Sequence, residues 1–228
     1  MTVVVFGFLL IVALAVLPTL WVQAVLARHR AERADFPGTG GEFARHLLDE
    51  MKLSSVKVEE TAIGDHYDPQ MKAVRLTPDH YHGRSLTAVV IAAHEVGHAM
   101  QDATGSALLR SRTRLARLAV WVERLGGIIM LAAPLAAILL RHPAGILVEL
   151  ATGFVILSLS AVLHIASLPS EFDASFNRAL PVLRAGRYIP DDDLPAARSI
   201  LRAAAFTYVA AALMSLINIA RWLRILRI

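Results

Sequence analysis

Residues 94–98 read His94-Glu95-Val96-Gly97-His98, the pattern H-E-x-x-H. On a helix, residues four positions apart share one face, so His94 and His98 can direct both imidazoles to one metal ion. Glu95 then stands beside that ion, where its carboxylate can activate water. Catalytic zinc is bound by three protein side chains and keeps a further position open. The motif therefore predicts a hydrolytic zinc site of the metalloprotease kind, for which one ligand is still missing.

The residues around the motif predict a helix. Ser85 is a suitable N-cap, and an apolar run without proline leads from it into the motif. After the motif, Gly105 is a typical helix stop. The alternative is a pair of surface histidines that flank an exposed glutamate, and the apolar surroundings argue against it. We therefore expect the motif to lie within a helix.

The composition indicates a membrane protein. Hydrophobic residues make up 56% of the 228 residues and charged residues 18%, and the mean hydropathy is +0.53. The apolar residues gather in four blocks, 2–27, 119–140, 146–168 and 203–220, and each reaches or approaches the roughly 20 residues that cross a bilayer. The predicted fold class is a mainly α membrane protein with about four transmembrane helices and a small zincin-like α+β catalytic lobe at the cytoplasmic face.

Basic residues set the predicted orientation, because arginines gather after the first block and before the second. The resulting division is a transmembrane anchor (1–27), the first part of the catalytic lobe with the motif helix (28–118), a transmembrane hairpin (119–168), the second part of the lobe with the third ligand (169–202), and a C-terminal transmembrane or interfacial helix (203–228). Arginines at the C-terminus disagree with this orientation. We therefore expect the last block either to cross the membrane or to lie in its interface.

The charge pattern indicates which kinds of partner the protein binds. The net charge of +4 comes mostly from arginines beside the apolar blocks, which suits a lipid bilayer with anionic headgroups better than nucleic acid. The sequence has no basic and aromatic stretch of the nucleic-acid-binding kind, so we expect no nucleic-acid partner. Cysteine is absent, which excludes disulfides, cysteine-ligated zinc and thiol catalysis. Nothing in the sequence indicates an oligomeric state.

The segment before the motif predicts a small α+β lobe. Thr39 and Glu42 form a capping-box pattern ahead of an amphipathic run. Two stretches of alternating polar and apolar residues follow, 55–60 and 72–76, with turn residues between them, and they predict a short β-hairpin. An exposed strand edge just before a catalytic helix can pair with an extended peptide.

The third ligand is expected on the same side of the membrane as the motif, after an even number of crossings. The chain returns there at Pro169 and Ser170, which predict the start of a new helix with Glu171 in its first turn. Glu171 is the candidate ligand, although a carboxylate that stabilises a helix N-terminus is the simpler alternative. Asp173 competes, but on a helix it lies about 200° around the axis from Glu171.

Several motifs together resemble the YugP-type bacterial membrane zinc metallopeptidases. They are AAHEVGHAMQDA (92–103), HYDP (66–69), GRS (83–85), LPSEFDAS (168–175) and TYVAA (207–211). The resemblance extends from about residue 35 to the last apolar block. It implies a neutral zinc peptidase of the bacterial inner membrane, with His94 and His98 as zinc ligands, Glu95 as catalytic carboxylate and one Zn²⁺ per chain.

A more distant similarity links the chain to HtpX-type and prenyl-protein membrane proteases, whose returning helix carries Glu-Phe-x-Ala-Asp. In that pattern the Asp commonly orients a histidine ligand. Ser175 stands in its place here. We therefore expect the histidines to be oriented by Asn177, by Asp68 or by a backbone carbonyl.

The predicted activity is that of a membrane-bound endopeptidase. Glu95 acts as general base toward zinc-activated water and passes the proton to the leaving amine. His66, Tyr67 and Tyr208 are candidate oxyanion donors. The expected substrate is a peptide or a membrane protein, and membrane-protein quality control is an analogy with related proteases.

Two other functions compete with this one. A catalytically inactive membrane scaffold or metal-binding protein would keep the zincin fold without turnover. An intramembrane protease would place the motif in a crossing helix, but only a short apolar run precedes His94.

Overall fold

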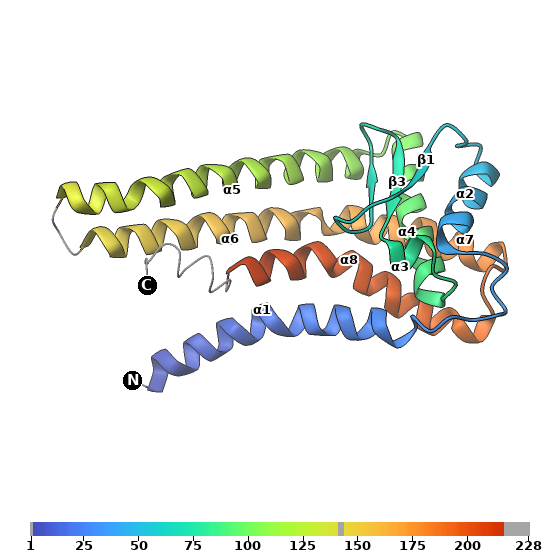
Figure 1. The fold of residues 1–228 in the computed structure, drawn as a ribbon, viewed down its shortest axis with the longest axis horizontal. Coiled ribbons are helices and arrows are strands. Elements are labelled where there is room, and N and C mark those ends of the chain that lie inside the picture. Colours follow the sequence, from blue (N-terminus) through green and yellow to red (C-terminus); the bar gives the residue numbers. More distant parts are fainter. Residues whose placement is uncertain (1, 141–143, 217–228) are drawn as a thin grey trace. The chain divides into compact units, whose positions relative to one another are not determined.

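The structure is a computed structural model that describes residues 2–140 and 144–216, and its chain divides into two compact units. The helical unit comprises Met1–Leu20, Arg112–Ser167 and Thr207–Ile228, as far as these are described. The α+β unit comprises Trp21–Ser111 and Leu168–Phe206. Figure 1 labels helices α1–α8 and strands β1 and β3.

The helical unit is built from parts of four long helices. These are α1 (Thr2–Arg28), α5 (Ala107–Leu140), α6 (Ala144–Phe172) and α8 (Leu194–Leu216). Polar contacts join them inside the unit: Ser160 Oγ on α6 donates to Glu123 on α5 at 2.7 Å. The ring of His164 on α6 stacks on Tyr208 of α8 with a centroid distance of 6.3 Å.

The prediction of about four transmembrane helices was wrong. Among the residues that the structure describes, none of the helices combines the length and the apolar character that a bilayer crossing requires. The apolar blocks do not coincide with separate crossing helices, because the helices continue beyond them into charged sequence. For example, α5 begins at Ala107 and takes in arginines 110, 112, 114 and 117 before the apolar block. Residues 217–220 of the last block lie outside the described residues.

The predicted helix after Thr39 is confirmed as α2 (Gly40–Glu50). Thr39 Oγ1 accepts the backbone N–H of Glu42, and the Glu42 carboxylate accepts the backbone N–H of Thr39, so both halves of the capping box form. The apolar face of α2 is buried, with Leu47 and Leu48 at most 1% exposed. This helix therefore supplies one wall of the α+β core.

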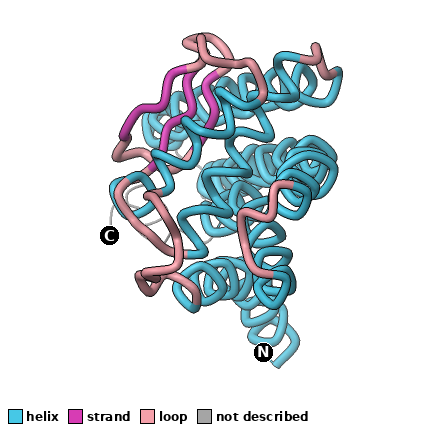
Figure 2. The backbone as a smooth tube through the Cα atoms, turned by 90° about the vertical axis from the view of Figure 1, so that its right-hand side faces the viewer, coloured by secondary structure: helices cyan, strands magenta, loops and turns pink. Residues whose placement is uncertain are grey.

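The predicted hairpin of 55–60 and 72–76 was wrong in its connection. β1 (Lys57–Glu60) and β3 (Ala73–Leu76) are neighbours, but they run parallel. The intervening residues form another strand, β2 (His66–Asp68), which pairs antiparallel with β3. The sheet order is β1-β3-β2, and Figure 2 shows the three strands side by side. The residues between 60 and 72, which were expected to form a turn, include β2 and run back along the sheet. β3 can therefore lie between β1 and β2.

The motif helix is α4 (Leu86–Ala103), with the predicted ends. The Ser85 hydroxyl accepts the backbone N–H of Ala88, and Gly105 follows the helix with φ +62°. A short helix, α3 (Pro78–Tyr81), leads from the sheet to α4. Because α4 contacts α2, β2, β3 and the returning chain, most of it is buried.

The returning chain departs from the prediction of a new helix at Pro169. α6 instead continues through Pro169 to Phe172 and becomes the π-helical segment η1 (Asp173–Ala179). α7 (Leu180–Ala185), the 3₁₀ turn η2 (Asp191–Asp193) and α8 follow. A Cβ atom on Gly97 would lie 2.6 Å from the carbonyl oxygen of Ala174, so glycine is what allows α4 and η1 to approach. This packing brings the end of α6 to the motif.

Candidate metal centre

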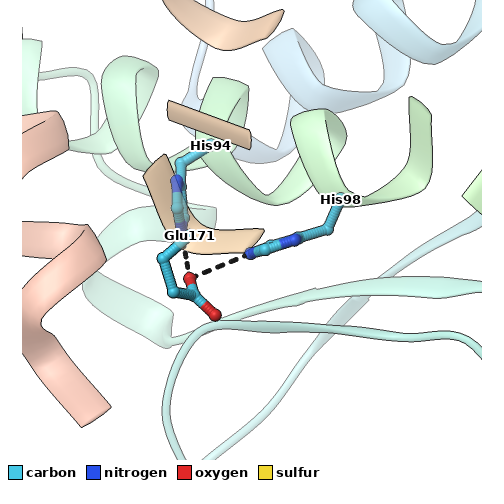
Figure 3. Close-up of side chains that lie close together, drawn as sticks. All are labelled: His94, His98 and Glu171. Atoms are coloured by element: carbon cyan, nitrogen blue, oxygen red, sulfur yellow. Dashed lines mark hydrogen bonds and ion pairs between the residues drawn. The ribbon is translucent and has the colours of Figure 1, made fainter. Parts of the chain in front are cut away.

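Three side chains converge where α4 meets the end of α6. Glu171 Oε2 lies 3.1 Å from His98 Nε2 and 3.4 Å from His94 Nε2. Figure 3 shows both imidazoles directed at this one carboxylate oxygen. His94 is 3% exposed, and His98 and Glu171 are 0% exposed. Two elements that are far apart in the sequence thus bring two nitrogen donors and one oxygen donor together in a dry environment.

The spacing of these donor atoms suits a small divalent cation. Ligands about 2.0–2.2 Å from a tetrahedral Zn²⁺ lie about 3.3–3.6 Å from one another. The two nitrogen–oxygen distances of 3.1 and 3.4 Å match that separation, and the donor atoms of all three residues lie within 4.8 Å of one another. Two imidazoles and one carboxylate are also a typical ligand set of catalytic zinc. His94, His98 and Glu171 can therefore hold one metal ion.

Ser175 determines which ring nitrogen of His94 carries the hydrogen. Ser175 Oγ lies 3.0 Å from His94 Nδ1 and 3.2 Å from the carbonyl oxygen of Leu201. A carbonyl oxygen only accepts, so the single hydroxyl hydrogen goes to Leu201 and the hydroxyl accepts from His94 Nδ1–H. A neutral imidazole then presents the lone pair of Nε2 to the metal position. Ser175 thus takes over the orienting task for which the sequence had suggested other residues.

Gln101 contacts the other histidine. Its Oε1 lies 2.9 Å from His98 Nδ1, and its side chain is 0% exposed. The sequence analysis did not identify Gln101. The signal was present, because Gln101 follows His98 by three positions and therefore shares its face of α4. The structure shows that each histidine of the motif has its own partner at Nδ1.

Tyr67 and Asp68 make their described hydrogen bonds to residues other than the three converging side chains. Tyr67 Oη donates to Asp102 at 2.7 Å, and burial together with this bond raises the pKa of Tyr67 well above its ordinary value. Asp68 accepts from Arg75 at 2.8 Å. Burial opposes ionisation of Asp68, but backbone N–H donors and Arg75 lower its pKa overall. Both residues thus have strong partners within the sheet and α4.

The remaining candidates also have partners. His66 Nδ1 lies 2.8 Å from the carbonyl oxygen of Gly64. Asn177 donates to Asp173 at 3.0 Å, and not to either motif histidine. Tyr208 belongs to the helical unit, where it stacks on His164 and lies under the guanidinium of Arg112. Of the predicted residues, His94, His98 and Glu171 are thus the three whose donor atoms are described as lying around one point.

Glu95 lies between the two histidines in the sequence of α4 and is 5% exposed. The motif thus supplies two imidazoles that converge on Glu171 and a further buried carboxylate between them in the sequence, the residue types that HExxH zinc hydrolases use. The fold and the site thus define the class of helical HExxH proteins with a histidine, histidine and glutamate metal centre.

Comparison with known proteins gives the family. The family described as "Putative neutral zinc metallopeptidase" matches residues 3–227. The chain is also 32% identical over 226 residues, 96% of either chain, to the "Putative membrane protease YugP" of Bacillus subtilis (strain 168). The chain belongs to this neutral zinc metallopeptidase family. No solved structure matches it significantly. The predicted resemblance to YugP-type peptidases is confirmed.

Proposed function

We propose that this protein is an endopeptidase that binds one Zn²⁺ per chain through His94, His98 and Glu171. The observation that carries the proposal is the convergence of His94 Nε2 and His98 Nε2 on Glu171 Oε2, with both imidazoles oriented from behind at Nδ1. Membership of a zinc metallopeptidase family supports the choice of zinc.

Bound zinc supplies Lewis acidity that polarises the scissile carbonyl and makes water more acidic. Glu95 accepts the proton of the attacking water and delivers it to the leaving amine. Glu95 directly follows the proposed ligand His94 on α4 and is only 5% exposed, which supports this role. The attacking group is water and no side chain becomes covalently attached to the substrate.

We propose His66 rather than Tyr67 as the oxyanion donor, because the Tyr67 hydroxyl already donates to Asp102. The Gly64 carbonyl can only accept, so His66 Nδ1 carries a hydrogen. His66 Nε2 can then donate to an oxyanion only when the ring is positively charged.

The substrate is proposed to be an extended peptide segment, such as part of a membrane protein. β2 supports this because it is an edge strand, and Tyr67 on β2 is hydrogen-bonded to Asp102 of α4. The name of the Bacillus relative supports action at a membrane. A role in membrane-protein quality control is proposed by analogy with related membrane proteases and is tested by identifying the substrates.

The test of the activity compares the wild type with Glu95→Gln. The variant should bind zinc like the wild type but hydrolyse peptides about 10²- to 10⁴-fold more slowly, because it lacks the general base. Glu50→Gln on the exposed end of α2 is the matched control and should leave the rate unchanged. Equal hydrolysis rates for wild type and Glu95→Gln would refute Glu95 as the general base, and a zinc-loaded wild type that hydrolyses no peptide would favour the scaffold.

The same variant reveals the substrates. Membrane peptides should accumulate in cells that produce Glu95→Gln and disappear when the wild type replaces it, as followed by mass spectrometry. If the peptide populations are the same in both cells, proteolysis is not the cellular role of the protein.

A further inference from the structure

The side chain of Gln101 is completely buried and makes every hydrogen bond that an amide can make. Its Oε1 lies 2.9 Å from His98 Nδ1 and 3.3 Å from Ser170 Oγ. Its Nε2 lies 2.9 Å from the carbonyl oxygen of Ser170 and 2.8 Å from a carboxylate oxygen of Asp173. Two acceptor positions and two donor hydrogens are thus all used.

These contacts allow only one orientation of the amide. The Ser170 carbonyl can only accept, so the group that faces it is the NH₂ group of Gln101. Asp173 is ion-paired with Arg178 at 3.0 Å and accepts the second hydrogen of that group. The carbonyl oxygen of the amide must then face His98, and Nδ1 of His98 must carry the hydrogen. The lone pair of His98 Nε2 is thereby directed at Glu171 and the metal position.

The same amide joins the two segments that provide the metal ligands. Ser170 directly precedes Glu171 in the chain, and its carbonyl oxygen is fixed by Gln101 of α4. If the end of α6 moved, the side chain of Gln101 would therefore transmit that movement to His98. Ser175, by contrast, contacts His94 but does not hold the backbone next to Glu171.

We propose that Gln101 is a positioning residue that fixes His98 in its metal-binding tautomer and couples it to the segment that carries Glu171. This inference rests on the proposed zinc site. Partners behind metal ligands typically account for 10- to 100-fold of metal affinity. Gln101 should contribute at this scale before any substrate is bound.

The first test is the zinc affinity of Gln101→Met, which keeps the length of the side chain but removes all four hydrogen bonds. We expect the zinc Kd of the folded variant to increase 10- to 100-fold, as measured by competition with a chromophoric chelator. The absorption spectrum of the Co²⁺-loaded variant should also differ from that of the wild type, since His98 is no longer held. Gln70→Met, at an exposed glutamine, is the control and should match the wild type in both measurements.

The outcomes separate the two proposals. A wild type that binds no zinc would overturn the proposed function and this inference with it. A wild type that binds zinc, together with a folded Gln101→Met of equal affinity and spectrum, would overturn this inference alone. If Gln101→Met does not fold, nitrogen NMR of the zinc-free wild type decides: a hydrogen on His98 Nδ1 supports the inference, and an Nδ1 without one overturns it.

Discussion

Ser175 Oγ accepts a hydrogen bond from His94 Nδ1 at 3.0 Å, at the position where the distantly similar HtpX-type pattern has an aspartate. The hydroxyl is buried and gives its own hydrogen to the carbonyl oxygen of Leu201. A neutral group can therefore orient the histidine as an aspartate would. The environment behind His94 carries one negative charge fewer, so this imidazole should be a weaker donor to the metal than one backed by carboxylate.

Ser175→Ala should weaken zinc binding about 10- to 100-fold, because His94 Nδ1 loses its acceptor and the ring loses its fixed orientation. Zinc titration of the purified variant checks this. Ser167→Ala is a matched control, since the Ser167 hydroxyl bonds only to the carbonyl of His164 on the same helix. If both variants bind zinc as tightly as the wild type, Ser175 does not orient His94.

Gly97→Ala should destabilise the protein by roughly 1–3 kcal/mol, because the new methyl group would meet the carbonyl oxygen of Ala174 at 2.6 Å. The same change within a helix would otherwise stabilise it by up to about 1 kcal/mol, so the sign of the effect is diagnostic. Urea unfolding of the zinc-free protein measures it. Stabilisation by Gly97→Ala would mean that α4 and η1 do not pack as described.

Asp65 should make stability depend on pH. It accepts from His80 at 2.7 Å and from the backbone N–H of Thr77 at 2.7 Å. Burial opposes ionisation, but the bonds with His80 and Thr77 outweigh it and lower the pKa of Asp65 below its ordinary value. A carboxyl group with a lowered folded-state pKa stabilises the fold above its unfolded pKa of about 4, and this contribution is lost as the pH falls through the folded-state pKa.

Asp65→Asn should accordingly lower the free energy of unfolding by about 1–3 kcal/mol at pH 7, and the difference from the wild type should shrink as the pH falls below about 4. Urea unfolding across this range tests the prediction. Asp79→Asn is the control: its exposed carboxylate pairs with Arg30 at the surface, and its loss should cost no more than about 0.5 kcal/mol. A pH-independent effect of Asp65→Asn would contradict the lowered pKa of Asp65 in the folded protein.

Zinc should stabilise the folded protein, because its three ligands lie together only in the folded chain. Free zinc at 100 times Kd should add about 2.7 kcal/mol to the free energy of unfolding, and a chelator should remove this increment. His94→Ala should abolish most of the increment, whereas His82→Ala, at an exposed histidine, should retain it. Equal increments in the two variants would place the zinc elsewhere.

The parts of the fold that follow from local chemistry could be predicted. The capping box at Thr39 and the Ser85 cap specify their helices through neighbouring residues alone, and both helices form where expected. The parallel pairing of β1 with β3 could not be predicted, because it depends on the intervening strand β2. β2 pairs antiparallel with β3 and carries the chain back before β3 begins. The apolar blocks were assigned to bilayer crossings by counting, although helix ends do not follow the limits of those blocks.

The candidate site shows the same division. The spacing of His94 and His98 follows from helix geometry. The sequence prediction of Glu171 depended on two bilayer crossings between it and the motif, and no described helix could make such a crossing. The continuous helix through Pro169 and the π-helical turn after it result from packing against α4, which no local pattern records. The role of Gln101 could not be predicted, because it depends on contacts with Ser170 and Asp173 that exist only in the folded chain.

Zinc-edge anomalous diffraction from crystals of the zinc-loaded protein examines the proposed ligand set directly. We predict one zinc peak per chain, within about 2.0–2.2 Å of Nε2 of His94, Nε2 of His98 and a carboxylate oxygen of Glu171. A peak bound by other residues, or one that excludes Glu171, would contradict the proposed metal centre.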